Sequence, residues 1–354
     1  MDIKALIRRE VLAQKAYNAE APSCRIKLDA NENPFALSPA LKDELFRVMR
    51  DTQLNRYPDA GSPRLRKLFA DRYGVNREMV MLGNGSDELI QILCFALAGP
   101  GAAALVPVPA FAMYRITSLN AGFRVIEVPL DLDFDLDVDA IRQHVGNNVP
   151  ALTFLGYPNN PTGKCFSRER IETIIRASGG LVVVDEAYGN FSRKTFLSLL
   201  DKYENLVVLR TLSKVGLAAM RIGLLVGSAS LVRELEKVRL PYNLNSLSQV
   251  AAGFYLEHEA EFLRQAEEII ERRDDLYRKL KKIEGIRPFP SDANFILFSC
   301  VFDADSIYEK LTGRGILVKN FNAPGITRNC LRVTVGRREE NEEFIQALKG
   351  AIAE

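Results

Sequence analysis

The feature that most constrains the fold of this chain is an alternation of short apolar segments with helical patterns between residues 65 and 227. Several apolar segments are continuous and β-branched, as in strands that are covered on both faces. The expected strands are Met79–Leu82, Ala102–Val106, Arg124–Val128, Ala151–Leu155, Leu181–Val184, Leu206–Leu209 and Ile222–Val226. The expected helices between them are Ser86–Ala98, Ala110–Ala121, Val138–His144 and Arg168–Ala177. This order predicts an α/β fold with a mostly parallel sheet.

The pattern changes after Pro241. Residues 247–283 are predicted to be helical for most of their length, and a long amphipathic helix of this kind commonly spans a boundary between domains. The segments that follow have a strand, helix, strand, strand, helix order. They predict a smaller α+β domain at the C-terminal end.

Composition excludes several classes of protein. The chain has 47 Lys+Arg against 45 Asp+Glu, a formal net charge of +2. So small an excess of positive charge does not favour binding to nucleic acid, or to a membrane surface through a polybasic segment. Residues 89–114 carry no charge, but Gly99-Pro100-Gly101 interrupts them, so we expect a buried helix and strand and no membrane span. The five cysteines are scattered and only two histidines occur. We therefore expect reduced thiols, a cytoplasmic protein and no metal site.

Polar residues follow several of the expected strands, at the edge where α/β proteins bind ligands. Gly85-Ser86 precede a helix, Asn160 lies in a turn with two prolines, and Asp185 and Lys214 each follow an apolar strand. Each feature alone has an ordinary explanation, namely a helix cap, a turn or a surface charge. The third glycine of a dinucleotide fingerprint and the ending of a P-loop are missing from the glycine segment.

Together these residues suggest a specific chemistry. A lysine at such a crevice, beside an anion-binding helix start, an asparagine, a tyrosine and an acid, suits an aldehyde cofactor that carries a phosphate. The lysine would form a Schiff base, and the acid would pair with a protonated pyridine nitrogen.

At this point the chain resembles the fold-type I, pyridoxal-phosphate-dependent aminotransferases of class I/II. Within them it is most similar to the histidinol-phosphate aminotransferase family, from the Leu28–Pro34 segment to Leu331–Gly336. The resemblance implies a large cofactor-binding domain with a mostly parallel sheet at residues 46–254. It implies a small substrate-closing α+β domain that combines residues 1–45 with 255–354.

The resemblance also implies roles for the cofactor site. Lys214 would hold the pyridoxal 5'-phosphate covalently and move a proton, while Asp185 would pair with the pyridinium. Asn160 and Tyr188 would hydrogen-bond the phenolic oxygen of the ring, and Tyr188 is counted with the catalytic group. The remaining cofactor-binding residues would be Gly85, Ser86, Phe111, Ser213, Arg221 and, from the neighbouring subunit of a homodimer, Tyr57.

The implied reaction moves an amino group between histidinol phosphate and 2-oxoglutarate, giving imidazole acetol phosphate and glutamate in histidine biosynthesis. The substrate-binding residues would be Tyr17, Asn33, Lys319 and Arg332. One guanidinium at Arg332 can bind either a carboxylate or a phosphate, and Lys319 would favour the phosphate.

Two departures from the family pattern stand out. Arg221 lies seven residues after Lys214, one fewer than in many relatives, and Lys319 stands where relatives often carry an arginine. Lysine supplies the charge without the bidentate fork.

Three other functions stay open at this stage. A threonine-phosphate decarboxylase and an aromatic amino acid aminotransferase share the fold and cofactor. A non-enzymatic binding protein is the third, and the intact Lys214, Asp185 and Asn160 argue against it.

Overall fold

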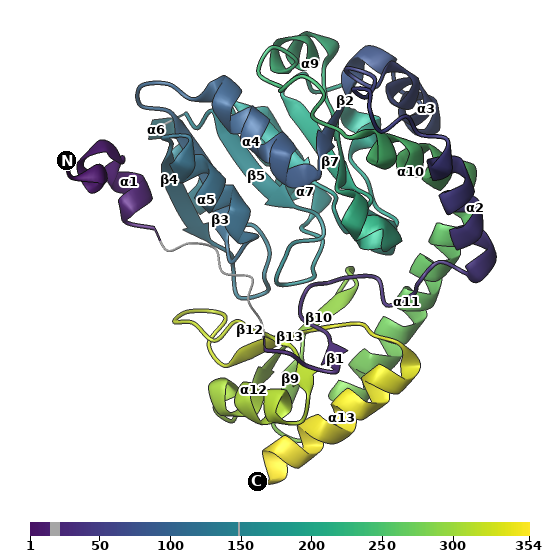
Figure 1. Ribbon diagram of the computed structural model, residues 1–354. Coiled ribbons are helices and arrows are strands. Elements are labelled where there is room, and N and C mark those ends of the chain that lie inside the picture. Colours follow the sequence, from purple (N-terminus) through teal and green to yellow (C-terminus); the bar gives the residue numbers. More distant parts are fainter. Residues whose placement is uncertain (15–21, 148) are drawn as a thin grey trace.

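The computed structural model describes residues 1–14, 22–147 and 149–354 (Figure 1). Within these residues the largest sheet has seven strands. In spatial order they are β2 (Val80–Asn84), β8 (Ile222–Val226), β7 (Leu206–Thr211), β6 (Leu181–Asp185), β5 (Leu152–Gly156), β3 (Ala103–Val108) and β4 (Arg124–Pro129). Strand β8 is antiparallel to both of its neighbours, and the other pairs are parallel. The predicted α/β fold with a mostly parallel sheet is confirmed.

Helices cover both faces of this sheet, which explains why its strands are mostly apolar. The edge strand β4, where Arg124 and Glu127 are exposed, is the exception. Val182 and Val184 of β6 point into one core cluster, while Val183 points into the other, as the alternation of a strand requires. The helices on the Val182 face are α6 (Val138–Asn147) and α7 (Arg168–Ala177). Those on the Val183 face are α4 (Ser86–Leu97), α5 (Ala112–Asn120) and α9 (Ala229–Leu235).

The C-terminal part forms a second, antiparallel sheet with the order β12 (Lys319–Asn320), β13 (Cys330–Thr334), β10 (Phe295–Cys300) and β9 (Ile286–Pro288). Helices α12 (Ala304–Gly313) and α13 (Arg338–Ala353) belong to the same part (Figure 1). The N-terminal strand β1 (Ile26–Lys27) pairs in parallel with β11 (Ile316–Leu317). Residues near the start of the chain are therefore built into its C-terminal part.

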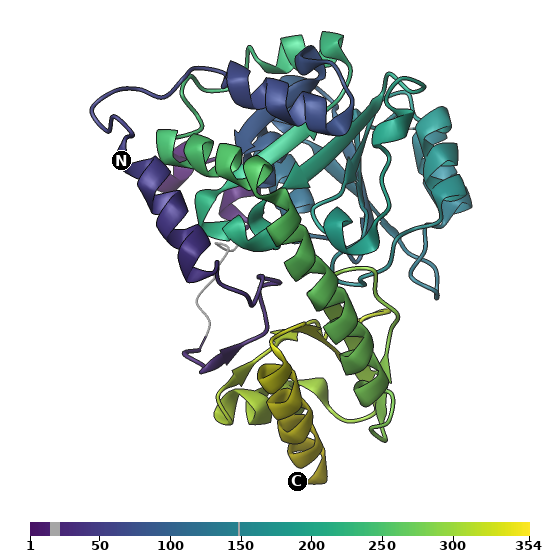
Figure 2. The same ribbon diagram turned by 90° about the vertical axis from the view of Figure 1, so that its right-hand side faces the viewer.

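Two helices occupy the segment predicted to be one long helix. Helix α10 (Ser246–Glu257) ends and α11 (Glu259–Leu280) begins around His258, whose φ of −116° and ψ of 21° are not helical. The His258 ring packs on Phe254 at 4.3 Å between ring centroids, and its Nε2 lies 3.5 Å from Glu44 Oε1. Tertiary contacts that periodicity does not encode thus stabilise the break. Figure 2 shows α11 in green, running from the region of the large sheet to the small one.

The remaining elements lie at the periphery or in connections. They are η1 (Ile3–Leu6), α1 (Arg9–Leu12), α2 (Pro39–Arg50), α3 (Pro63–Tyr73), η2 (Arg77–Met79), α8 (Gly189–Ser192), η3 (Leu197–Leu199), η4 (Ser213–Leu217) and η5 (Ala218–Met220). The domain limits at residues 46 and 254 fall inside α2 and α10, and the division stays a prediction. No helix in the described part of the chain has both the length and the apolar character needed to cross a bilayer.

Candidate active site

The residues predicted for the cofactor site meet in one pocket at the carboxyl ends of β5, β6 and β7. Parallel α/β sheets bind ligands at this edge because loops from several strands open there. The predicted residues that line the pocket are Ser86, Phe111, Asn160, Asp185, Tyr188, Ser213, Lys214 and Arg221. Sequence positions more than 130 residues apart thus contribute to one cavity.

The acid of the pocket is Asp185, the last residue of β6, which is only 4% exposed. Its Oδ2 accepts a hydrogen bond of 2.8 Å from the Tyr114 hydroxyl, and its Oδ1 accepts one of 2.9 Å from the backbone N–H of Ala187. Burial raises the pKa of Asp185 to about 6, and these two donors oppose the rise. Burial, with the nearby Asp185 charge, also raises the pKa of Tyr114 well above its ordinary value, so the phenol stays a donor. A cationic ligand group beside Asp185 would be strongly favoured.

We expect Tyr114→Phe to raise the pKa of Asp185 above about 6. A hydrogen bond to a charged group stabilises it by about 1.5–3 kcal/mol, so the rise should be roughly 1 to 2 pH units. The phenyl ring can keep the stacking of Tyr114 on Phe154, whose ring centroid lies 4.9 Å away. The measurement is a carbon NMR titration of the Asp185 carboxyl group in the ligand-free protein.

The sign of the pH dependence follows from the direction of the shift. Because the folded pKa of Asp185 lies above the ordinary 3.8, its contribution to stability is full below about pH 4 and is lost as the pH rises through 6. In Tyr114→Phe this loss should start at the same pH but continue to a higher pH, because only the folded pKa rises. Tyr255→Phe is the matched control, since it removes another buried phenol, 3.4 Å from Glu259. An Asp185 pKa that is the same in both variants would contradict the assignment.

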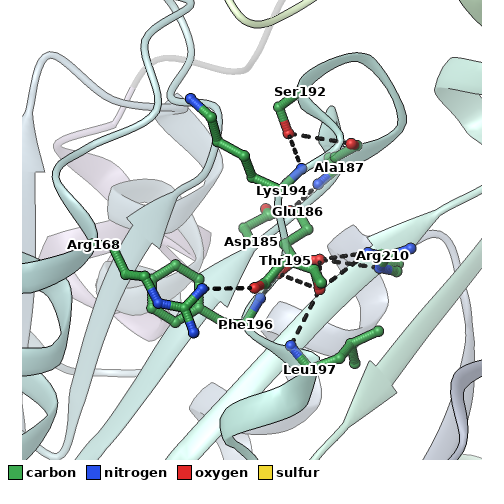
Figure 3. A network of polar contacts seen from close by, with 11 residues as sticks. Arg168, Asp185, Glu186, Ala187, Ser192, Lys194, Thr195, Phe196, Leu197 and Arg210 are labelled. Carbon is green, nitrogen blue, oxygen red and sulfur yellow. Dashed lines mark hydrogen bonds and ion pairs between the residues drawn. The ribbon is translucent and has the colours of Figure 1, made fainter.

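A buried ion pair fixes the chain directly after Asp185 (Figure 3). The Glu186 side chain accepts hydrogen bonds from Arg210 Nη2 at 2.7 Å, from the Thr195 hydroxyl at 2.9 Å and from the backbone N–H of Phe196 at 2.6 Å. With all of these donors on one carboxylate, the backbone at the end of β6 has little freedom. The hydrogen bonds of Glu186 therefore help to hold the neighbouring Asp185 in place.

An anion-binding corner lies at the start of α4. Arg221 donates to the Ser213 hydroxyl at 3.3 Å and to Asp87 Oδ2 at 3.0 Å. Gly85 has φ +82°, and a Cβ at this position would lie 2.6 Å from Arg221 Nη2. The free N–H groups of the first turn of α4, which starts at Ser86, lie next to this cation. Despite its shorter spacing from Lys214, Arg221 therefore lies at the same corner as Ser213.

The amine of the pocket is Lys214, in the turn η4. Its Nζ donates a hydrogen bond of 3.1 Å to the backbone oxygen of Ala30 and lies 5.8 Å from the centre of the Tyr188 ring. Phe111, at the start of α5, contributes an aromatic face to the same pocket. An amine, an acid and a corner that can bind an anion are thus combined in one cavity.

The guanidinium of Arg332 lies on β13 and is 5% exposed. It donates to Asn160 Oδ1 and to the backbone oxygen of Asp29, and it packs between the Phe295 and Phe321 rings at about 5 Å from each centroid. Arg332 thereby connects the small sheet to the pocket residue Asn160.

Lys319 of β12 is the direct cross-strand partner of Arg332. Directly opposite residues of antiparallel strands point to the same face with about 5 Å between their Cβ atoms. Lys319 is exposed, so its amine can reach solvent or a ligand.

Comparison with protein families agrees with this geometry. The family model described as aminotransferase class I and II matches residues 25–348. The chain belongs to this aminotransferase family. A histidinol-phosphate aminotransferase 2 of Nitrosococcus oceani is 45% identical over 97% of this chain and 96% of its own length. A histidinol-phosphate aminotransferase of Aquifex aeolicus is 40% identical over 98% of each chain.

A solved structure adds support for the fold. The histidinol-phosphate aminotransferase of Sinorhizobium meliloti, in complex with pyridoxal-5'-phosphate, superposes with a TM-score of 0.88. The match covers 98% of this chain and 97% of that one at 23% identity. The fold of the aminotransferase is thereby confirmed.

Several predicted residues of the aminotransferase are not among the residues that line this pocket. Gly85 adjoins the lining residue Ser86, Arg332 and Lys319 lie on the small sheet, and Tyr57 and Asn33 make other contacts. Tyr57 is 80% exposed and stacks on Tyr242 with 4.5 Å between centroids. Asn33 donates to Gln265 Oε1 of α11 at 2.9 Å and caps the turn at Phe35, so its amide is occupied by protein. Tyr17 lies outside the described residues. The roles of all the predicted site residues stay predictions.

Tyr114, Asp87 and Asn31 also contribute to the aminotransferase site, and none of them was predicted from the sequence. The spacing of Phe111 and Tyr114 places two aromatic rings on one helix face, which was the available signal for Tyr114. Asp87 was visible as the second residue of the helix after Gly85. Asn31 gave no signal, because its partners Tyr188 and Thr334 are distant in sequence.

Proposed function

We propose that this aminotransferase uses pyridoxal 5'-phosphate to move an amino group between histidinol phosphate and 2-oxoglutarate, giving imidazole acetol phosphate and glutamate. One observation carries the proposal. A lysine, a buried carboxylate and an anion-binding corner converge in one pocket of a chain whose relatives at 40–45% identity are named histidinol-phosphate aminotransferases. The same pocket would also serve the aromatic aminotransferase and the decarboxylase, so the names of these relatives are what favour histidinol phosphate.

The donor set of the pocket fits the cofactor. A Cβ at Gly85 would fill the space beside Arg221, so the bare backbone there leaves room for a phosphate. The raised pKa of Asp185 marks a buried carboxylate that a protonated pyridine nitrogen would stabilise. When bound, the cofactor supplies an aldehyde that condenses with amines and a ring that accepts the electrons of a breaking C–H bond.

Each side chain then has a defined task. The Lys214 amine would hold the cofactor through its aldehyde group, with release of water, and would carry a proton to or from the substrate carbon. The Asp185 carboxylate holds the proton on the pyridine nitrogen, while Asn160 and Tyr188 hydrogen-bond the phenolic oxygen. Ser213, Arg221 and the backbone at Gly85-Ser86 hold the phosphate, and Phe111 packs against the ring.

Substrate choice follows from charge on the small sheet. Glutamate presents an α-carboxylate where histidinol phosphate presents a phosphate, and the Arg332 fork can bind either anion. Lys319, on the same face of the sheet, adds a second positive charge that the phosphate can use. Tyr17 and Asn33 complete the proposed substrate pocket.

The function is tested by a panel of amino donors with 2-oxoglutarate, scored for glutamate. Histidinol phosphate should be preferred over phenylalanine and tyrosine. Preference for an aromatic donor would identify an aromatic aminotransferase instead. Release of carbon dioxide from threonine phosphate, without glutamate, would identify a decarboxylase.

Borohydride reduction should attach the cofactor to Lys214, because Lys214 lines the same pocket as Asp185 and Ser213. Peptide mapping by mass spectrometry locates the label. A label on Lys164 or Lys319 would overturn the site, and Lys214→Ala, which should give no label, is the control.

Lys319→Ala should weaken the binding of histidinol phosphate more than the binding of glutamate. Because Lys319 is exposed, we expect a loss of about 1 kcal/mol, roughly fivefold in affinity, for the phosphate substrate. Lys319→Arg should be tolerated or bind better, since it restores the fork. Single-turnover measurements of each half-reaction separate the two substrates, and equal losses in both would remove Lys319 from phosphate recognition.

We further propose that the enzyme is a cytoplasmic homodimer with shared active sites, in which Tyr57 contacts the cofactor phosphate of the neighbouring subunit. The 80% exposure of the Tyr57 ring leaves it available for this contact. A native mass of 39.6 kDa, that of one chain, would contradict the dimer.

A further inference from the structure

The residues Asp29–Asn31, which we call the strap, contact three functional side chains of the pocket. The backbone oxygen of Ala30 accepts from Lys214, and that of Asp29 accepts from Arg332. The Asn31 side chain donates from Nδ2 to the Tyr188 hydroxyl oxygen at 2.9 Å. Asn31 is 2% exposed and has a φ of 55°, so it occupies a constrained backbone position.

The other end of the Asn31 amide is fixed by Thr334. The backbone N–H of Asn31 donates to Thr334 Oγ1 at 3.0 Å, and the Thr334 hydroxyl donates to Asn31 Oδ1 at 3.1 Å. This reciprocal pair turns the amide oxygen toward Thr334 and the NH₂ group toward Tyr188. Asn294 adds a further hold, since its Nδ2 donates to the backbone oxygen of Asn31 at 3.0 Å.

The direction of the Asn31–Tyr188 hydrogen bond has a consequence for the Tyr188 hydroxyl. An amide nitrogen carries donors alone, so Tyr188 Oη accepts from it. The single hydrogen of the phenol must then point away from Asn31, and Tyr188 lines the pocket. Accepting a hydrogen bond also polarises a hydroxyl into a better donor.

We propose that Asn31 is a positioning residue, which turns the Tyr188 hydroxyl hydrogen toward the phenolic oxygen of the bound cofactor. This inference rests on the proposed function. Thr334 and the strap backbone hold the amide, and the amide sets the hydrogen of Tyr188. The ring of Tyr188 is already fixed by its edge-to-face contact with Phe295, at 5.1 Å between centroids, so Asn31 controls the hydroxyl rather than the ring.

The test compares how tightly the cofactor-free protein binds pyridoxal phosphate and 3-deoxypyridoxal phosphate, which lacks the phenolic oxygen. The ratio of the two dissociation constants, measured by equilibrium dialysis, reports what this oxygen contributes to binding. Tyr188→Phe should lower the preference for pyridoxal phosphate about 5- to 10-fold, the effect of one hydrogen bond. Asn31→Asp should lower it by the same factor at mildly alkaline pH, because a carboxylate can only accept and will draw the Tyr188 hydrogen to itself.

A pH signature separates this role from a general structural one. Burial raises the pKa of the introduced carboxyl group, and once protonated it regains a donor for Tyr188. The preference of Asn31→Asp for pyridoxal phosphate should therefore recover at mildly acidic pH. In Asn31→Ala this preference should stay low at both the acidic and the alkaline pH. The double variant Asn31→Asp/Tyr188→Phe should be no worse than Tyr188→Phe alone.

Asn341→Asp is the matched control, because it changes a buried asparagine that binds the Gly336 backbone in the small domain. It should leave the preference unchanged. The inference is overturned if the Asn31 variants keep the wild-type preference for pyridoxal phosphate. It is also overturned if the double variant loses as much preference as the two single variants together. Failure of the wild-type protein to bind either compound would instead overturn the proposed function.

Discussion

Asp185→Asn is expected to lower the turnover of the aminotransferase roughly a thousandfold or more, a loss of about 4 kcal/mol of transition-state stabilisation. The wild-type carboxylate is buried and held by the Tyr114 hydroxyl and the Ala187 N–H, so in the proposed cofactor site its charge would act on the pyridine nitrogen with little screening. An amide at this position cannot hold the proton on the pyridine nitrogen. The measurement is single-turnover kinetics at matched cofactor content.

The control for this prediction is Asp201→Asn, which makes the same charge change at an exposed position. It should leave turnover unchanged. Near-normal turnover of Asp185→Asn with the cofactor still bound would mean that the acid has only a structural role.

Arg332→Ala is expected to impair both half-reactions. Loss of a charge-assisted, bidentate contact in a partly desolvated site costs on the order of 2–5 kcal/mol, which corresponds to roughly 30- to 5000-fold. Because the guanidinium also donates to Asn160 and to the Asp29 backbone, the variant needs a check of folding by circular dichroism. Arg332→Lys keeps the positive charge but not the bidentate geometry, so its half-reaction rates should lie between those of Arg332→Ala and those of the wild type.

Arg328→Ala serves as the control, since it removes an exposed arginine from the same region of the chain. Loss in the histidinol phosphate half-reaction with an intact glutamate half-reaction would show that Arg332 does not bind the shared anion position.

The large sheet was predictable because its strands are buried on both faces and leave apolar runs in the sequence. The pocket residues were predictable where they directly follow those strands, as Asp185 and Lys214 do. The resemblance to the family supplied Arg221 and Arg332, which no local pattern identified.

Contacts between distant segments were not predictable from one sequence. The break at His258 lies beside Glu44, more than 200 residues earlier in the chain, and the helical period passes through the break unchanged. Tyr114 became a site residue only through its hydroxyl contact with Asp185, 71 positions away. Helix propensity predicts the helix that carries Tyr114, but it does not predict which strand end lies opposite the Tyr114 hydroxyl.

The strap has a consequence for the order in which the protein acquires its structure. Chains fold as they emerge from the ribosome, N-terminal end first. Asn31 of the strap is synthesised 303 positions before Thr334, the residue to which it is hydrogen-bonded. Strand β1 is likewise synthesised long before β11, the strand with which it pairs. The seven-stranded sheet, in contrast, is complete in sequence at Val226. A nascent chain can thus assemble the residues proposed to hold the cofactor ring and phosphate well before the strap has its partner Thr334.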